Sequence, residues 1–216
     1  MERAAIKELI KSTYDSIASS YQETYSEIDA MDRTKYWKVF TEICKGKRVL
    51  DMGCGDGDGT LFLLKKRNIP IGIDFSHAMI EIANKKSKDI EWVEGDICNC
   101  PFSDSFFSGI VLSYTINHLT DEMLIMVKEE IDRLLDKEGT LLLAFHVGEG
   151  EEIIKDPVDE NLEIYYHYYT KERITDVFNN YLELAYFQRH SMNPAELMHD
   201  KAFFTLQKIS NCTKEG

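Results

Sequence analysis

Three carboxylates follow short apolar segments of this sequence, and a glycine-rich turn accompanies the first of them. Asp51 precedes the turn Gly53-Cys-Gly-Asp-Gly57. Asp74 ends the next apolar segment, and Asp96 follows the third. Glycines let a chain leave a strand sharply and approach a ligand closely. A turn that opens a helix also directs free backbone N–H groups at the ligand. These residues therefore predict a binding site.

The spacing of the site residues restricts the ligand. Dinucleotide folds use the pattern G-x-G-x-x-G, whereas these glycines follow G-x-G-x-G, and a phosphate loop is absent. The carboxylate of Asp51 would repel a pyrophosphate and would attract an amino group. Asp74 suits the two hydroxyls of a ribose, as an acid does in nucleotide-binding βαβ units, and Asp96 with Ile97 suits an adenine. The predicted ligand has an amino-acid end, a ribose and an adenine.

Alternating short strands and helices position these residues. We expect apolar strands within 48–52, 70–74, 90–94, 108–114 and 139–146, and helices over 3–28, 32–45, 60–67, 78–86, 122–135 and 171–181. Two further strands, 182–190 and 202–209, are expected to pair antiparallel at one edge. The pattern predicts an α/β fold: a Rossmann-like, mostly parallel sheet with helices on both faces. The carboxyl ends of its strands would carry the site.

Composition narrows the class of protein. The 216 residues hold 25 Lys+Arg against 38 Asp+Glu, a net charge of −13. Duplex binding needs clustered basic residues, so we expect no nucleic acid partner and no membrane partner. No apolar run is long enough to span a bilayer, and the start lacks the pattern of a signal peptide. Five cysteines, an odd number, favour reduced thiols and a cytoplasmic location. The pair Cys98-Asn-Cys100 alone is a poor metal signature, so no metal is expected.

Five short segments in this order resemble one family. They are VLDMGCGDG (49–57), IGIDFS (71–76), EGDICNCPFSDSFFSGIVLSY (94–114), NHL (117–119) and RLLDKEGTLLLAF (133–145). Together they resemble the class I S-adenosylmethionine-dependent methyltransferases that act on small molecules. The sequence departs from that family at Glu138-Gly139, where the family has a glycine pair. The resemblance implies a seven-stranded sheet whose last strand is antiparallel.

The resemblance also implies the cofactor and its site. The cofactor would be S-adenosyl-L-methionine, with S-adenosyl-L-homocysteine as the product. Carried over to this sequence, the cofactor-binding residues are Tyr14, Tyr21, Asp51, Gly53, Cys54, Gly55, Asp74, Phe75, Met79, Asp96, Ile97 and Ser113. Residues 1–216 would form a single methyltransferase domain. Within it, 1–45 would be an N-terminal helical cap and 148–170 an insertion over the active site.

Histidines at predicted strand ends are candidate catalytic residues. Methyl transfer to oxygen or to a protonated amine needs a proton acceptor. His118 follows the predicted strand 108–114, and His146 ends the predicted strand 139–146. Candidate substrate residues are Tyr114, Asn117, His167 and Tyr168. The tyrosines around His167 would suit an aromatic or cationic acceptor. The expected reaction is direct in-line displacement onto a small molecule, with nitrogen or oxygen favoured over carbon.

Two other functional classes stay open at this point. The same fold can serve a non-catalytic or non-methylating S-adenosylmethionine-binding protein, because a fold does not determine its chemistry. A protein methyltransferase is the second alternative. The expected assembly is a monomer or homodimer. Intact cofactor motifs favour the small-molecule enzyme over the binding module.

Overall fold

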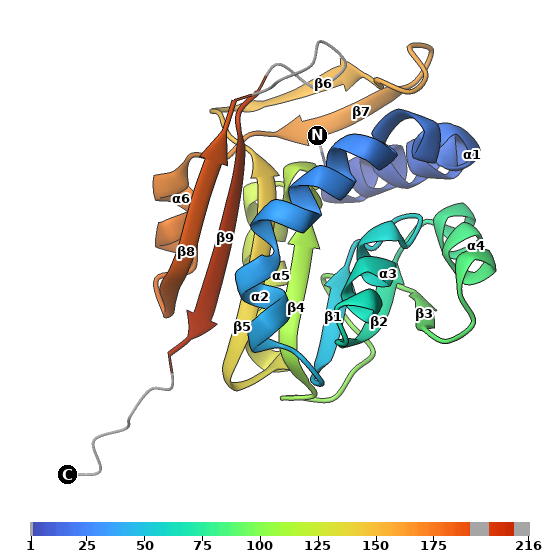
Figure 1. Ribbon diagram of the computed structural model, residues 1–216. Helices are drawn as coiled ribbons and strands as arrows, with labels where there is room; N and C mark the ends of the chain where they lie inside the picture. The colour runs from blue at the N-terminus through green and yellow to red at the C-terminus, as the bar shows by residue number, and fades with distance from the viewer. Residues whose placement is uncertain (1, 191–198, 210–216) are drawn as a thin grey trace.

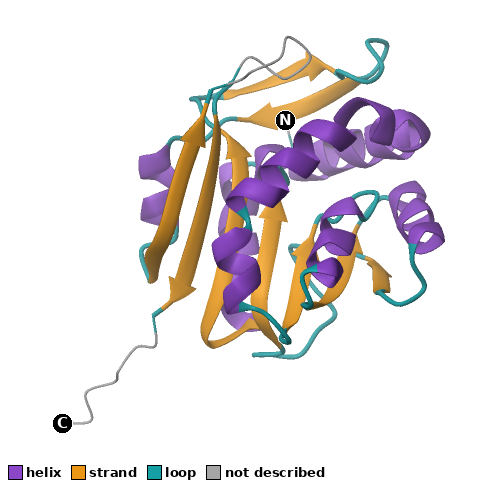
Figure 2. Cartoon of the chain, viewed as in Figure 1, coloured by secondary structure: helices purple, strands orange, loops and turns teal. Residues whose placement is uncertain are grey.

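A seven-stranded sheet with the strand order β3-β2-β1-β4-β5-β9-β8 forms the centre of the molecule (Figures 1 and 2). The computed structural model describes residues 2–190 and 199–209. Strands β1 to β5 are parallel, and β9 is antiparallel to both of its neighbours. This confirms the predicted Rossmann-like sheet. The strands are β1 (Arg48–Met52), β2 (Ile69–Asp74), β3 (Glu91–Glu94), β4 (Phe107–Ser113), β5 (Leu135–His146), β8 (Tyr181–Arg189) and β9 (Lys201–Lys208).

Side-chain caps fix where several helices begin. The hydroxyls of Ser76, Thr120 and Thr170 accept hydrogen bonds from the first-turn N–H groups of α4, α5 and α6, which satisfies donors that have no partner within the helix. The helices are α1 (Arg3–Tyr36), α2 (Lys38–Ile43), α3 (Asp58–Lys65), α4 (His77–Lys86), the 3-10 helix η1 (Ile116–His118), α5 (Asp121–Leu134) and α6 (Lys171–Val177).

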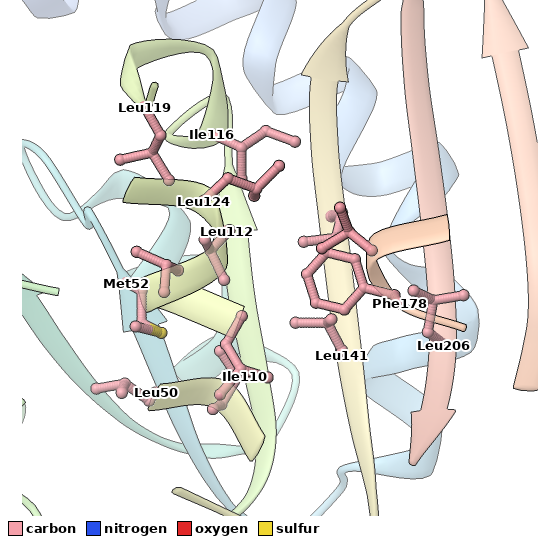
Figure 3. Packing of buried hydrophobic residues seen from close by; sticks show 14 of the residues in the cluster. Leu50, Met52, Ile110, Leu112, Ile116, Leu119, Leu124, Leu141, Phe178 and Leu206 are labelled. Carbon is pink, nitrogen blue, oxygen red and sulfur yellow. The ribbon is translucent and has the colours of Figure 1, made fainter. Parts of the chain in front are cut away.

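The sheet is apolar on both faces because successive strand residues point to opposite sides. On one face, Leu50, Ile110 and Leu141 pack with the buried sides of α5 and α6 (Figure 3). On the other face, their neighbours Val49, Val111 and Leu142 pack with α2 and α3. The helices thereby hold the strands rigid and present their carboxyl ends on one side of the molecule.

The N-terminal segment differs from the sequence prediction. Two helices, 3–28 and 32–45, are expected there, whereas α1 continues to Tyr36 and only the short α2 follows. Neither glycine nor proline stands between 28 and 32, so nothing in the chain forces a break. The continuous helix also carries Asp32 to a buried ion pair with Arg189, at 2.8 Å.

A hairpin forms in the long connection after β5. Strands β6 (Glu151–Lys155) and β7 (Glu163–His167) pair antiparallel. The hairpin and the first part of α1 lie together beyond the carboxyl ends of the parallel strands (Figure 1). The Thr13 hydroxyl donates to the Glu163 carbonyl at 2.7 Å, and Ile10 packs against Tyr165. Across the described ranges, no helix is both long and apolar enough to cross a bilayer.

Candidate functional site

A pocket lies between the carboxyl ends of the parallel strands and helix α1. Strands β2 and β4, the turn after β1, the loop after β3, η1 and α5 contribute to it. Its walls are formed by Lys7, Ile10, Tyr14, Tyr21, Gly53, Gly55, Asp74, Phe75, Gly95, Asp96, Ile97, Cys98, Ser113, Tyr114, Thr115, His118, Leu119 and Met123. This is the position where open α/β sheets bind ligands.

The glycine turn follows β1 and is tied to β2. The backbone N–H groups of Gly53 and Cys54 both donate to the Ile73 carbonyl, at 2.8 and 3.0 Å. Gly53 has a φ of +75°, and a Cβ there would lie 2.4 Å from Oγ1 of Thr115. Gly55 has a φ of +51°, and a Cβ there would meet no heavy atom within 4 Å. The turn therefore needs glycine at 53 and leaves open space at 55, which a ligand would fill.

Asp51 lies behind the turn rather than in the pocket wall. Its side chain is buried, and the Thr60 hydroxyl donates to it at 2.7 Å. Burial raises the pKa of Asp51 to about 6, because the charged form loses its hydration. Cys54 and Met79 are also buried without contributing to the wall. Three of the twelve residues expected around a cofactor thus lie one layer behind the pocket.

Asp74 ends β2 at the pocket wall and is held by two backbone donors. The N–H of Gly55 donates to one carboxylate oxygen and the N–H of Ser76 to the other, each at 2.9 Å. Burial nevertheless raises the pKa of Asp74 to about 6. Each carboxylate oxygen has a second lone pair, so this carboxylate can still accept the two hydroxyls of a diol.

Asp96 follows β3 and is paired with a residue of α1. The Lys7 ammonium donates to one oxygen at 2.5 Å, and the N–H of Cys98 donates to the other at 2.9 Å. Burial raises the pKa of Asp96, but these donors outweigh it and lower the pKa overall. Ile97 lies beside this carboxylate in the wall. A planar base with an exocyclic amino group fits that combination of acceptor and apolar side chain.

Aromatic side chains form the wall on the α1 side. Tyr14 packs edge-on against Tyr21, with ring centroids 6.0 Å apart, and Tyr14 and Phe75 both pack against the buried cluster that contains Ile10. The Tyr14 hydroxyl lies 2.7 Å from Nε2 of His118. Of the two candidate catalytic histidines, His118 reaches the pocket, whereas His146 is buried among Tyr114 and Tyr166.

The four candidate substrate residues have different surroundings. Tyr114 lines the pocket, and its hydroxyl donates to Asp32 at 3.0 Å. Asn117 is buried outside the wall: its amide donates to the carbonyls of His146 and His167 and accepts from the N–H of His146. The other two residues, His167 and Tyr168, also lie outside the wall, where their rings pack on Tyr169 and His199.

Several wall residues were missed from the sequence. Lys7 and Ile10 share one helix face with Tyr14 and Tyr21, at spacings of three, four and seven residues, so that periodicity could have located them. The others adjoin predicted positions in the chain or lie in the first turn of α5: Cys98, Leu119 and Met123. Within the described part of the chain, no group of three or more metal-ligating side chains occurs. The predicted thiol Cys212 lies outside the described residues.

Comparison with known proteins identifies this arrangement. Residues 49–139, which begin in β1 and end within β5, match the family model described as Methyltransferase domain. Over these residues, which make up less than half of the chain, it is similar to the class I S-adenosylmethionine-dependent methyltransferases. The match begins in β1 and includes the glycine turn, Asp74 and Asp96.

Named relatives show how far the similarity extends. A demethylmenaquinone methyltransferase from Staphylococcus saprophyticus is 28% identical over 151 residues, which cover 65% of this chain and 64% of the relative. The chain therefore matches less than two thirds of that relative's length.

Solved structures share the fold of this chain. The 1,6-didemethyltoxoflavin-N1-methyltransferase of Burkholderia thailandensis, bound to its substrate and S-adenosylhomocysteine, has a TM-score of 0.73 at 15% identity, over 96% of this chain and 89% of that one. A [4+2]-cyclase has a TM-score of 0.63 at 16% identity, over 79% of this chain and 80% of that one. Likeness in fold alone therefore does not decide the reaction.

Proposed function

We propose that this chain binds S-adenosylmethionine in the pocket beneath α1 and transfers its methyl group to a small-molecule acceptor. The observation that carries the proposal is the placement of Asp74 and Asp96 on one pocket wall beside the open glycine turn. Asp74 would accept the ribose hydroxyls, and Asp96 with Ile97 would hold the adenine. The backbone at Gly53 and Gly55 would face the methionine part, with Asp51 behind it.

The remaining residues of the proposed cofactor site surround these contacts. Phe75 would pack on the base, and Ser113 would lie against the cofactor after β4. Tyr14 and Tyr21 would close the site from α1. Cys54 and Met79, which are buried behind the wall, would support it by packing. Bound S-adenosylmethionine supplies an activated methyl group on a positively charged sulfur.

The protein contributes orientation and exclusion of water. Holding an acceptor lone pair in line with the methyl carbon supplies most of the rate in a displacement of this kind. The apolar and aromatic wall keeps the site dry, which favours a reaction that neutralises a sulfonium charge. We propose a nitrogen or oxygen acceptor, with His118 as the proton acceptor in preference to His146, which lies outside the pocket wall.

An aromatic acceptor is the substrate class that the wall favours. Tyr14, Tyr114 and His118 contribute rings to the pocket wall, and ring faces bind planar ligands well. The named relatives act on demethylmenaquinone and 1,6-didemethyltoxoflavin, which are acceptors with ring systems. Tyr114 would contact such an acceptor directly, whereas Asn117, His167 and Tyr168 would shape its surroundings.

Calorimetric titration followed by a transfer assay tests the proposal. We expect micromolar binding of S-adenosylmethionine and S-adenosylhomocysteine, no binding of NAD, and transfer of a radiolabelled methyl group to members of a phenol and amine panel. Absence of binding to both adenosyl ligands would refute the proposed cofactor. Binding without transfer to any panel member would favour the non-methylating class, of which the cyclase is a structural example.

Cofactor binding is expected to depend on pH between 5 and 7. The pKa values of Asp51 and Asp74 are each raised to about 6, so both carboxyls bind protons as the pH falls through 6. A ligand that donates to the charged Asp74 carboxylate in the pocket wall lowers its pKa, and binding then releases a proton. The affinity for S-adenosylhomocysteine should therefore rise by about tenfold from pH 5 to pH 7.

Titrations at pH 6 in buffers of different ionisation enthalpy measure the released protons directly. The control is Asp74→Asn, which should bind more weakly and release fewer protons. The stability of the unliganded protein has the opposite pH dependence. Because their pKa values are raised in the folded state, these two groups favour folding more at pH 5 than at pH 7. An affinity for S-adenosylhomocysteine that stayed constant from pH 5 to pH 7 would contradict the assignment of the Asp74 carboxylate to the ligand site.

A further inference from the structure

His118 is connected to two different elements through its two ring nitrogens. The residue ends η1, directly after β4, and its side chain is buried. Its Nδ1 lies 2.9 Å from the carbonyl oxygen of Tyr165 on β7, and its Nε2 lies 2.7 Å from the hydroxyl of Tyr14 on α1. Three elements that meet over the pocket are thus joined by one short hydrogen-bonded chain.

The direction of each hydrogen bond in this chain is determined. A carbonyl oxygen only accepts, so the short contact to Tyr165 requires the proton on Nδ1. Burial lowers the pKa of His118 to about 4, so the imidazole is neutral near pH 7 and carries a single proton. Nε2 must then accept, and the Tyr14 hydroxyl must donate. The Tyr14 proton therefore points toward His118, and the oxygen offers lone pairs to groups in the pocket.

We propose that the Tyr14 oxygen takes up the proton of the methyl acceptor and that His118 acts through it. This inference rests on the proposed function and specifies its substrate class: a nucleophile that carries an N–H or O–H group. The acceptor lone pair forms the bond to the methyl carbon while the carbon–sulfur bond breaks, and that electron pair stays on sulfur. The acceptor proton moves to the Tyr14 oxygen, and the Tyr14 proton moves to Nε2 of His118.

The charge of the pocket explains how a buried imidazole can serve as this proton acceptor. Burial disfavours protonation of His118 when protonation adds a charge to the pocket. During the proposed step, however, one positive charge disappears from the sulfonium as one appears on the imidazole. The number of buried charges is unchanged, so the reaction carries no additional desolvation of charge. A neutral acceptor that has no proton to give would keep the positive charge after methylation and could not use this route.

A binding experiment tests the chain without relying on turnover. Sinefungin carries an amine where S-adenosylmethionine carries the sulfonium methyl, and that amine donates hydrogen bonds. Because a charge-assisted hydrogen bond contributes about 1.5–3 kcal/mol, the unmodified protein should bind sinefungin at least about tenfold more tightly than S-adenosylhomocysteine. Tyr14→Phe should lose this preference and keep its affinity for S-adenosylhomocysteine within about threefold.

The matched control is Tyr181→Phe. The Tyr181 hydroxyl donates to Asp132 at 2.8 Å, so this variant also loses one tyrosine hydrogen bond, but away from the pocket, and it should retain the preference. A Tyr14→Phe protein that still preferred sinefungin would overturn the inference and leave the proposed function intact. An unmodified protein that bound neither ligand would overturn the proposed function itself.

Nitrogen NMR and a conservative substitution separate proton uptake from positioning. Histidine ¹⁵N shifts should place the single proton of His118 on Nδ1, and a proton on Nε2 would overturn the inference. In the transfer assay, His118→Gln can still accept a hydrogen bond from Tyr14 but cannot take up a proton. We expect kcat to fall by about 100-fold in both His118→Gln and Tyr14→Phe, with the KM for the cofactor little changed. Full activity of His118→Gln would reduce His118 to a positioning residue.

Discussion

Asp74→Ala is expected to weaken binding of S-adenosylhomocysteine by at least about 100-fold, because two hydrogen bonds to a charged acceptor are lost. The carboxylate is held by the N–H groups of Gly55 and Ser76, so it meets the ligand without having to be ordered first. Preorganised acceptors of this kind contribute more to binding affinity than mobile acceptors do. Isothermal titration calorimetry at pH 7 measures the loss.

A neighbouring acid provides a matched control for this prediction. Glu94 ends β3 in register with Asp74, but its side chain is exposed and bonded to His77. Glu94→Ala should therefore bind as the unmodified protein does. Circular dichroism should show that both variants are folded, since removal of Asp74 also frees two backbone donors. Unchanged affinity in a folded Asp74→Ala protein would exclude Asp74 from the ligand site.

Gly53→Ala is expected to lower the free energy of unfolding by about 2–4 kcal/mol, from backbone strain and steric overlap together. The φ of +75° is unfavourable for alanine, and the new Cβ would lie 2.4 Å from Oγ1 and 2.5 Å from Cγ2 of Thr115. Displacement of Thr115 would also break its hydrogen bond to the Met52 carbonyl. Urea denaturation followed by circular dichroism measures the change.

Gly46 separates the two causes of this destabilisation. It has the same φ of +75° but no heavy atom within 4 Å of a Cβ, so Gly46→Ala should cost only about 1 kcal/mol. Adding Thr115→Ala to Gly53→Ala should recover part of the loss, because the overlapping atoms are removed. The interaction energy from this double-mutant cycle should be at least about 0.5 kcal/mol. Equal losses for Gly46→Ala and Gly53→Ala would refute the steric contribution.

The order of strands and the main carboxylates were predictable from the sequence. Buried strands that alternate with helices specify a parallel sheet, and residues just after such strands must lie at its carboxyl edge. Asp74 and Asp96 satisfy this rule, and both line the pocket. The antiparallel pair β8 and β9 was predictable because two alternating segments follow one another at the end of the described chain.

The direction of side chains beyond a strand end was not predictable. Asn117 and His118 are consecutive, yet Asn117 is turned inward to the backbone of β5 and β7, whereas His118 lies on the pocket wall. That choice depends on where the β6–β7 hairpin presents its carbonyl groups, which are distant in the sequence. The contribution of α1 was underestimated for a similar reason: the spacing can place Lys7 on the helix face of Tyr14, but it gives no sign of the distant carboxylate partner.

The ion pair between Lys7 and Asp96 makes the two acidic ends of the pocket differ in the unliganded protein. Asp96 already receives an ammonium donor from α1, whereas Asp74 receives only backbone N–H groups. An adenine amino group at Asp96 would replace one donor by another, so contact there is an exchange rather than a net gain. The energy of recognition would then come mostly from the ribose end. The beginning of α1 would stay over the ligand, because Thr13 and Ile10 also hold it to β7.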